Sequence, residues 1–210
     1  ADLAPTVGKY QNSIGSAQIS LKQLDAAIEH FTRAVELESD NADFWANLAT
    51  ARMYSGNAEG AISDFNRAIA LESDHYQSRQ NLADIFSRQN RPKDALPHLE
   101  RAAQHPDHRV ESVLHLASTY ERLNQLTNAE QVMREVGESD HPWALVLRAR
   151  LLRRRGNPAS GLALLRAANP AVHGPLDNDI AGIWHHELAL CADQAGETED
   201  VFENCLTAKS

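Results

Sequence analysis

The chain has 210 residues, 42% of them hydrophobic, and carries a net charge of −9 from 29 acidic and 20 basic side chains. That composition belongs to a folded globular protein, and the negative charge argues against nucleic acid and anionic lipid as partners, because both attract positive surfaces. No apolar run approaches the roughly 20 residues of a membrane-spanning helix. Cys191 and Cys205 are the only cysteines. They do not make a disulfide framework, so a reducing, cytoplasmic compartment is expected, with a single bridge and a periplasmic or secreted location left open.

An internal repeat begins in the N-terminal part of the chain. Alanines recur every 34 residues, and each is followed four residues later by a large apolar residue and three residues after that by a small or β-branched one. Positions i, i+4 and i+7 lie on one face of a helix, so each repeat is expected to end in a helix with an apolar stripe. The three columns are Ala27, Ala61, Ala95 and Ala129; Phe31, Phe65, Leu99 and Met133; and Ala34, Ala68, Ala102 and Val136.

A second amphipathic segment precedes each of these stripes. In the second repeat this segment ends at Gly56, and in the third and fourth repeats it ends at Asn90 and Asn124. Gly and Asn tolerate the left-handed backbone conformation that closes a helix. Each repeat is therefore predicted to be helix–turn–helix.

The second repeat also carries a family signature. The pattern W-x2-L-A at residues 45–49, followed by A-x3-F-x2-A at 61–68, resembles the motif of tetratricopeptide repeat (TPR) proteins. This resemblance implies an all-α fold, a right-handed superhelical solenoid of about six units and twelve helices. Four units are clear and two diverge, since the fifth has Arg148 where Leu is usual and Gly161 where Ala is usual. The whole chain, 1–210, is expected to be one TPR domain with units at 8–41, 42–75, 76–109, 110–141, 142–169 and 180–208.

The architecture points to binding. Helix pairs of this size stack to share a core, and in the TPR family the first helices line a concave groove that contacts a protein or peptide. A regulatory or substrate-recruiting arm of a longer enzyme, of the glycosyltransferase or sulfotransferase type, is the alternative. No cofactor is expected. Carrying the family's groove positions onto this chain selects Asn47, Thr50, Tyr54, Gln77, Asn81, Asp84, Arg88, His115, Glu121, Arg122, Arg150, Arg153 and Arg154.

Two asparagines of this set occupy the same repeat position. Asn47 and Asn81 each offer a donor and an acceptor, which suits the backbone of an extended peptide. TPR proteins such as the O-linked GlcNAc transferase use asparagine ladders at the corresponding position. The ladder is short here, with Ser13 before it and His115 after it, and solvation of an exposed helix face explains the same residues equally well.

Arginines concentrate in the first helix of the fifth unit. Arg150, Arg153 and Arg154 are expected to face the groove, where guanidinium groups suit the carboxylates of an acidic partner segment. The alternative is that these arginines are solvated or pair with acids of the same chain. Both interpretations remain open at the level of sequence.

Catalytic and metal sites are not expected. Asp74, Asp107 and Asp140 each precede a histidine at a junction between units, where Asp is a natural N-cap of the next helix. In the sixth unit His185 is predicted to pack inwards, with His186 and Glu187 facing the groove. No Walker, GxSxG, HExxH or CxxC motif is present, so the chain is predicted not to be an enzyme.

The last unit ends without a clearly polar closing helix. Val201, Phe202, Cys205 and Leu206 leave an apolar pattern near the C-terminus. A terminal repeat needs a polar outer face for solubility. These residues therefore predict a neighbour, which could be a further domain, a partner chain or a second copy of this chain.

Overall fold

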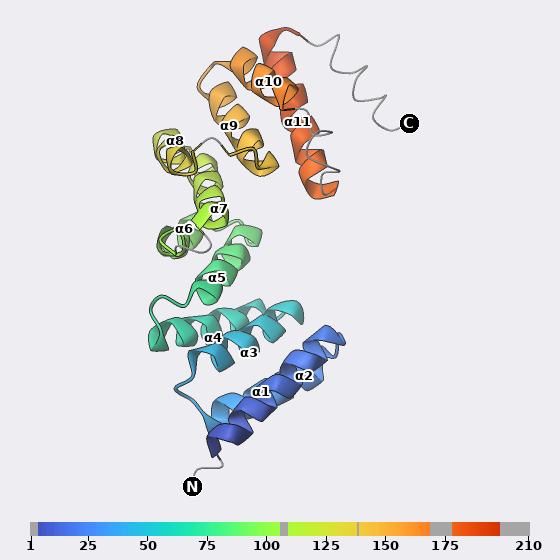
Figure 1. Ribbon diagram of the computed structural model, residues 1–210, viewed down its shortest axis with the longest axis vertical. Coiled ribbons are helices and arrows are strands. Elements are labelled where there is room, and N and C mark those ends of the chain that lie inside the picture. Colours follow the sequence, from blue (N-terminus) through green and yellow to red (C-terminus); the bar gives the residue numbers. More distant parts are fainter. Residues whose placement is uncertain (1–3, 106–108, 138, 169–177, 198–210) are drawn as a thin grey trace. The chain divides into compact units, whose positions relative to one another are not determined.

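The helical repeat predicted from the sequence is present in the structure (Figure 1). The computed structural model describes residues 4–105, 109–137, 139–168 and 178–197, and within these ranges it contains eleven helices and no strand. The twelfth predicted helix falls at 198–210, outside the described residues. The helices are α1 (Ala4–Ser20), α2 (Leu24–Leu37), α3 (Ala42–Tyr54), α4 (Ala58–Leu71), α5 (Tyr76–Arg88), α6 (Pro92–Ala102), α7 (Arg109–Arg122), α8 (Leu126–Glu135), α9 (Pro142–Arg154), α10 (Pro158–Ala167) and α11 (Asn178–Ala195).

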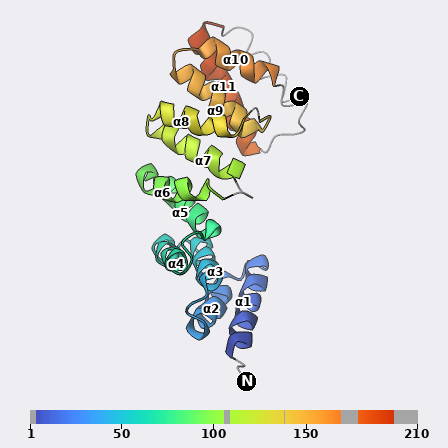
Figure 2. The same ribbon diagram turned by 60° about the vertical axis from the view of Figure 1, so that its left-hand side comes forward.

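The chain divides into two compact units. Unit 1 is Ala1–Arg109 and holds α1 to α6, and unit 2 is Val110–Ser210 and holds α7, apart from its first residue, to α11. The division falls at the predicted border between the third and fourth repeats. Within unit 1, α2 packs on α3 and α4 packs on α5, so consecutive helix pairs share their interior as stacked repeats do (Figure 2). The expectation of a single domain over 1–210 stays a prediction.

The turns inside the helix pairs have the predicted backbone. Gly56, Asn90, Asn124 and Gly156 all have positive φ angles, and so does Lys22 at the equivalent position of the first pair. In the second pair the Asn57 N–H donates to the Arg52 carbonyl at 2.9 Å, which closes α3 in the manner of a Schellman motif. The Asn57 side chain then accepts from the Gly60 N–H and caps α4.

The predicted apolar columns form the interior. The four alanines of the first column have no exposed surface, and Phe31, Phe65, Leu99 and Met133 are buried between helices. Unit 1 has one cluster around Phe31 that joins α2 to α3, and unit 2 has one around Leu147 that joins α7, α8 and α9. The hydrophobic period of the sequence therefore selected the correct helix faces.

The prediction that aspartates cap the incoming helices is wrong at the described junctions. The N-cap of α5 is His75, whose Nδ1 accepts from the Ser78 N–H at 3.2 Å, while Asp74 accepts from Arg101 Nε at 2.6 Å. The N-cap of α9 is likewise the histidine, His141. At each of these two junctions one more residue, the histidine, is extended before the helix begins. The aspartate therefore lies one residue before the capping position. Asp107 lies outside the described residues.

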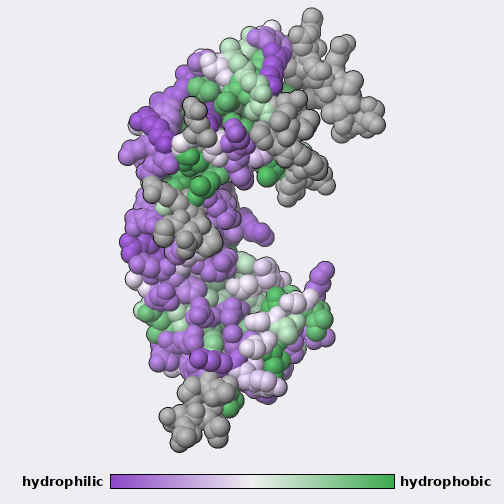
Figure 3. Space-filling view, in the orientation of Figure 1, coloured by the Kyte–Doolittle hydropathy of each residue, from purple (hydrophilic) through white to green (hydrophobic). Residues whose placement is uncertain are grey.

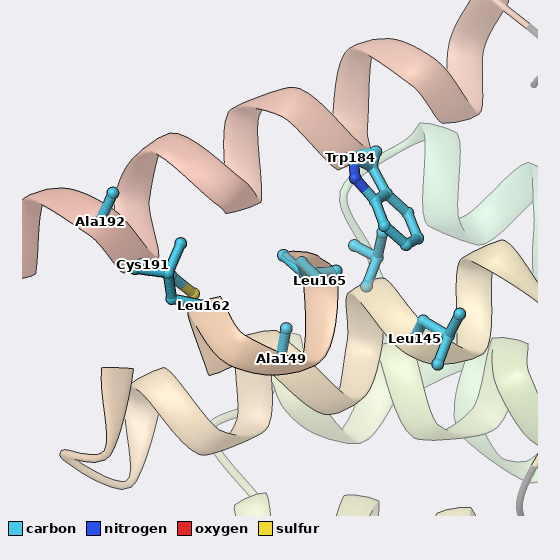
Figure 4. Close-up of a cluster of buried hydrophobic side chains, with 8 residues drawn as sticks. Leu145, Ala149, Leu162, Leu165, Trp184, Cys191 and Ala192 are labelled. Carbon is cyan, nitrogen blue, oxygen red and sulfur yellow. The ribbon is translucent and has the colours of Figure 1, made fainter. Parts of the chain in front are cut away.

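The divergent fifth pair packs against α11. Leu145 and Ala149 of α9, Leu162 and Leu165 of α10, and Trp184 and Cys191 of α11 form its core (Figure 4). Gly161 replaces the usual alanine for a steric reason. A Cβ at this position would lie 2.8 Å from the Ala149 carbonyl oxygen and 3.1 Å from Cys191 Sγ. Burial raises the pKa of the Cys191 thiol to about 11, with a further contribution from the nearby Glu187 carboxylate.

Candidate functional site

Unit 1 carries a row of neutral polar side chains on its first helices, α1, α3 and α5. Asn47 Nδ2 donates to Asn12 Oδ1 at 2.9 Å, Asn81 Nδ2 donates to Thr50 Oγ1 at 3.4 Å, and Gln77 Nε2 donates to Asn81 Oδ1 at 3.1 Å. The first two hydrogen bonds connect different helix pairs. We call these five residues, Asn12, Asn47, Thr50, Gln77 and Asn81, the amide row.

The members of the amide row differ in how much solvent they meet. Asn47 and Thr50 are half-buried and Gln77 is exposed, whereas Asn81 is only 8% exposed. The hydrogen bond to Asn12 uses one of the two Asn47 amide donors, so the group keeps a second donor and its carbonyl oxygen for a ligand. Asn81 has its carbonyl oxygen and one donor engaged by neighbours. Although the two asparagines share a repeat position, Asn47 is the more accessible one.

The other predicted groove residues of unit 1 lie near the row at varied depth. Tyr54, at the end of α3, is 59% exposed, Asp84 is half-buried and Arg88 is exposed. The structure thus brings the residues selected on α3 and α5 onto neighbouring helices that pack in the same unit.

Two residues of this surface were not selected from the sequence. Asn12 lies 35 residues before Asn47, so it falls outside the 34-residue period that pointed to Ser13. Ser13 instead donates from Oγ to the Lys9 carbonyl of its own helix at 2.9 Å. The second missed residue is His75, whose Nε2 lies 3.1 Å from Asp43 Oδ1 and so connects the start of α5 to α3.

Unit 2 carries charged groups on its first helices, α7, α9 and α11. Arg150 Nε donates to Glu187 Oε2 at 3.0 Å and Arg153 Nε donates to Glu187 Oε1 at 2.6 Å. Arg154 donates to both the carbonyl and the carboxylate of Glu121. Arg150 Nη1 also lies 3.8 Å from Glu121 Oε2 and so stands between the two acids. We call Glu121, Arg150, Arg153, Arg154 and Glu187 the arginine–glutamate network.

Both carboxylates of the network are buried. Glu187 is 1% exposed and Glu121 is 6% exposed. A buried carboxylate is stable only with charged or hydrogen-bonding partners, and the three arginines supply them. The hydrogen bond that Arg153 donates to Glu187 raises the pKa of Arg153, which burial alone would lower. The network therefore connects α7, α9 and α11 through side chains of the same chain.

The remaining arginines of this region also contact the chain. Arg155 pairs with Glu130 at 2.8 Å, and this hydrogen bond lowers the pKa of the Glu130 carboxyl. Arg148, which stands where Leu is usual, donates to the Gly137 carbonyl at the end of the α8 segment. The internally paired alternative is thus what the structure shows for the side chains of all five arginines.

The predicted orientation of α11 is wrong. Trp184 is buried and His185 is exposed, and Glu187 is buried in the network rather than facing a groove. The buried face of α11 runs through Trp184, Glu187 and Cys191, so one carboxylate lies within an otherwise apolar stripe. Apolar periodicity could not reveal it. Of the other selected residues, His115 is half-buried and Arg122 is exposed.

The part of the chain that the structure describes offers no group of three or more His, Cys, Asp or Glu side chains that could hold a metal ion. A separate search of its helices finds none that is long and apolar enough to span a membrane. The polar side chains of both units hydrogen-bond and form ion pairs between neighbouring helices, as the stacked helices of a repeat protein do.

The sequence matches the profile of the tetratricopeptide repeat family at residues 12–76, 46–109 and 81–142. These matches together cover more than half of the chain, so the protein belongs to the TPR family. A search of curated proteins finds no sequence match.

Solved structures show the same fold. The chain is similar to a tetratricopeptide repeat protein from Parabacteroides merdae, with a TM-score of 0.80, 17% identity and coverage of 96% of this chain and 80% of that one. It is similar to PilW, a type IV pilus biogenesis factor, with a TM-score of 0.73, 16% identity and coverage of 97% and 91%. It is also similar to YrrB, described as a TPR protein with an unusual peptide-binding site, with a TM-score of 0.67, 19% identity and coverage of 81% and 88%.

Proposed function

We propose that this protein binds an extended peptide segment of a protein partner along α1, α3 and α5 of unit 1, and that it acts as an interaction scaffold without catalysis of its own. The observation that carries the proposal is the amide row. Its groups are held in place by hydrogen bonds between helix pairs, so little side-chain freedom is lost when a ligand binds. One structural relative, YrrB, is described as having a peptide-binding site.

The chemistry of the row suits a peptide backbone. Each peptide unit has one N–H and one carbonyl. An amide side chain can accept a hydrogen bond from the N–H and donate one to the carbonyl, whatever the ligand's sequence. Asn47 retains a donor and an acceptor, with Gln77 and Tyr54 exposed nearby. Recognition of this kind favours extended segments over folded surfaces.

The arginine–glutamate network has a different role in this proposal. Its arginines neutralise buried carboxylates of the same chain, so an acidic partner segment would have to compete with Glu121 and Glu187 for them. We therefore assign the network to the cohesion of unit 2 and place peptide binding in unit 1.

The experiment starts from a random peptide library of about 10 to 12 residues, long enough to cross three helix pairs. The intact chain selects ligands, and fluorescence anisotropy measures their affinity. The Asn47→Ala variant is expected to bind about tenfold more weakly, because it loses one or two hydrogen bonds. The matched control is Asn66→Ala, which removes an exposed asparagine from the second helix α4.

The two variants separate the outcomes. Loss of affinity in Asn47→Ala with Asn66→Ala unchanged supports the proposal. Equal affinity of both variants and the wild type would contradict it, since the selected peptides would then bind elsewhere on the chain.

A further inference from the structure

The face of α1 turned away from α2 is apolar and exposed. Val7, Tyr10, Ile14, Ala17 and Leu21 follow one another at alternating intervals of three and four residues, which places the first four along one side of α1 and Leu21 directly after its last residue. Tyr10 is 66% exposed and Leu21 is 68% exposed. Figure 3 shows hydrophobic residues at the surface in the region of α1 and α2, at its lower right. We call these five residues the α1 stripe.

The repeat itself indicates what such a stripe accepts. Residues 34 positions after Tyr10, Ile14 and Ala17 are Phe44, Leu48 and Ala51 of α3, and all three are buried in one cluster with α2. The equivalent residues of α5 are buried as well, namely Ser78, Leu82 and Ile85. In both later pairs this face packs on the second helix of the preceding pair. The α1 stripe is thus the counterpart of an interface that the protein uses twice within unit 1.

The second helices have their own pattern. In α2 the residues that meet α3 include Ala27, Phe31 and Ala34, spaced by four and then three residues. The same spacing recurs near the C-terminus at Val201, Cys205 and Ala208. The chain therefore contains, in its last segment, a sequence of the type that the α1 stripe fits.

We propose that the α1 stripe of one copy receives the segment 201–208 of a second copy, so that chains join head to tail. In a pair of copies, one copy then keeps an unused stripe and the other keeps an unused segment. Further copies can add to these two ends, because a heterologous contact stops growing only where its geometry closes a ring. Association should therefore produce a range of oligomers that lengthen with concentration rather than one dimer.

The test is sedimentation velocity on the intact chain over a concentration series up to about 500 µM, a range that reveals weak contacts of small area. The wild type is expected to show an average mass that rises with concentration. The variant Tyr10→Glu with Leu21→Glu should remain monomeric. Its matched control, Tyr54→Glu with Leu37→Glu, places the same charges at exposed apolar residues outside the stripe and should associate like the wild type.

A second pair of variants tests the other end of the contact. Cys205→Glu should also remain monomeric, whereas Thr207→Glu, which lies off the pattern, should associate. Mixing the two monomeric variants leaves one intact stripe and one intact segment, so the mixture should form a dimer and nothing larger. Circular dichroism checks that each variant keeps the helix content of the wild type.

Other occupants of the stripe give different results. Stripe-to-stripe pairing would leave Cys205→Glu associated, and association through the surface near Tyr54 would be lost in the control. A wild-type chain that is monomeric throughout, as it would be if the segment covered its own stripe, contradicts the proposal. So does a mixture of the two variants that remains monomeric.

Discussion

The first helices of the two units occupy the same place in the repeat but carry different polar chemistry. In unit 1 they present amides and a hydroxyl, whose hydrogen bonds to one another leave donors and acceptors to spare. In unit 2 they present arginines and glutamates that satisfy one another across α7, α9 and α11. A neutral row can be half-buried and still meet a ligand, whereas buried charges need partners within the fold. The comparison shows that the first helices of the repeat carry a neutral hydrogen-bonded row in one unit and a set of mutually paired charges in the other.

The largest expected effect comes from removing the central acid of the network. Glu187→Ala leaves Arg150 and Arg153 without their nearest carboxylate, so the free energy of unfolding of unit 2 should fall by about 2–4 kcal/mol. Urea unfolding followed by tryptophan fluorescence measures the change, in a Trp45→Phe background so that Trp143 and Trp184 of unit 2 are the reporters. The control is Glu197→Ala, which breaks the exposed pair with Arg166 and should cost less than about 0.5 kcal/mol. Equal losses in the two variants would refute a cohesive role for the network.

The next effect tests the packing beneath the network. Gly161→Ala forces a methyl group against the Ala149 carbonyl and Cys191, and should destabilise unit 2 by about 1–3 kcal/mol. Gly182→Ala, on α11, places its methyl group in open space and should stabilise the chain by about 0.5–1 kcal/mol. Thermal unfolding of both variants provides the measurement. A neutral Gly161→Ala would show that α10 packs less closely on α9 and α11 than these distances indicate.

A smaller effect separates the two surfaces by their response to salt. Binding through the amide row involves neutral groups, so the affinity for a selected peptide should change less than about twofold between about 0.05 and 0.5 M salt. Binding through arginines would weaken steeply over the same range. Anisotropy titrations with a peptide that depends on Asn47 make this measurement. A steep loss of affinity with increasing salt would contradict binding through the neutral amide row and would indicate that charged groups bind the peptide.

The smallest effect is expected at the margin of the network. The hydrogen bond from Arg155 lowers the pKa of Glu130 in the folded chain, so this pair stabilises the fold above the ordinary value of 4.5 and loses its contribution as the pH falls through the lowered pKa. Glu130→Gln should hardly change the unfolding midpoint at pH 7 and should slightly flatten the loss of stability in acid. Thermal unfolding from pH 7 down to about pH 3 tests this. An effect as large as that of Glu187→Ala would show that exposure is a poor guide to the importance of these ion pairs.

Much of the fold could be predicted from the sequence, because the relevant signals are local. The left-handed turn at Gly56 and the burial of Phe31 and Phe65 follow from residues within one helix pair. The helix starts were less predictable. Whether Asp74 or His75 caps α5 depends on one extended residue and on Arg101, which lies in the next helix.

The candidate site could be predicted only as a set of helix faces. The sequence placed Asn47 and Arg150 on first helices, yet it indicated neither the Asn12 contact nor the Glu187 contact. Each of these interactions joins residues more than 30 positions apart. Glu187 was further concealed by its apolar surroundings on α11, which made His185 seem the inward residue.

By itself, the sequence determined the helix pairs, their turns, their buried columns and the family, because each depends on spacing within one repeat. The tertiary structure alone decided which polar side chains of those helices meet each other and which remain open to a ligand. The reason is physical. Periodicity assigns a side chain to a face, but the partner that satisfies its charge or hydrogen bonds comes from another helix pair, and only packing brings that partner within reach.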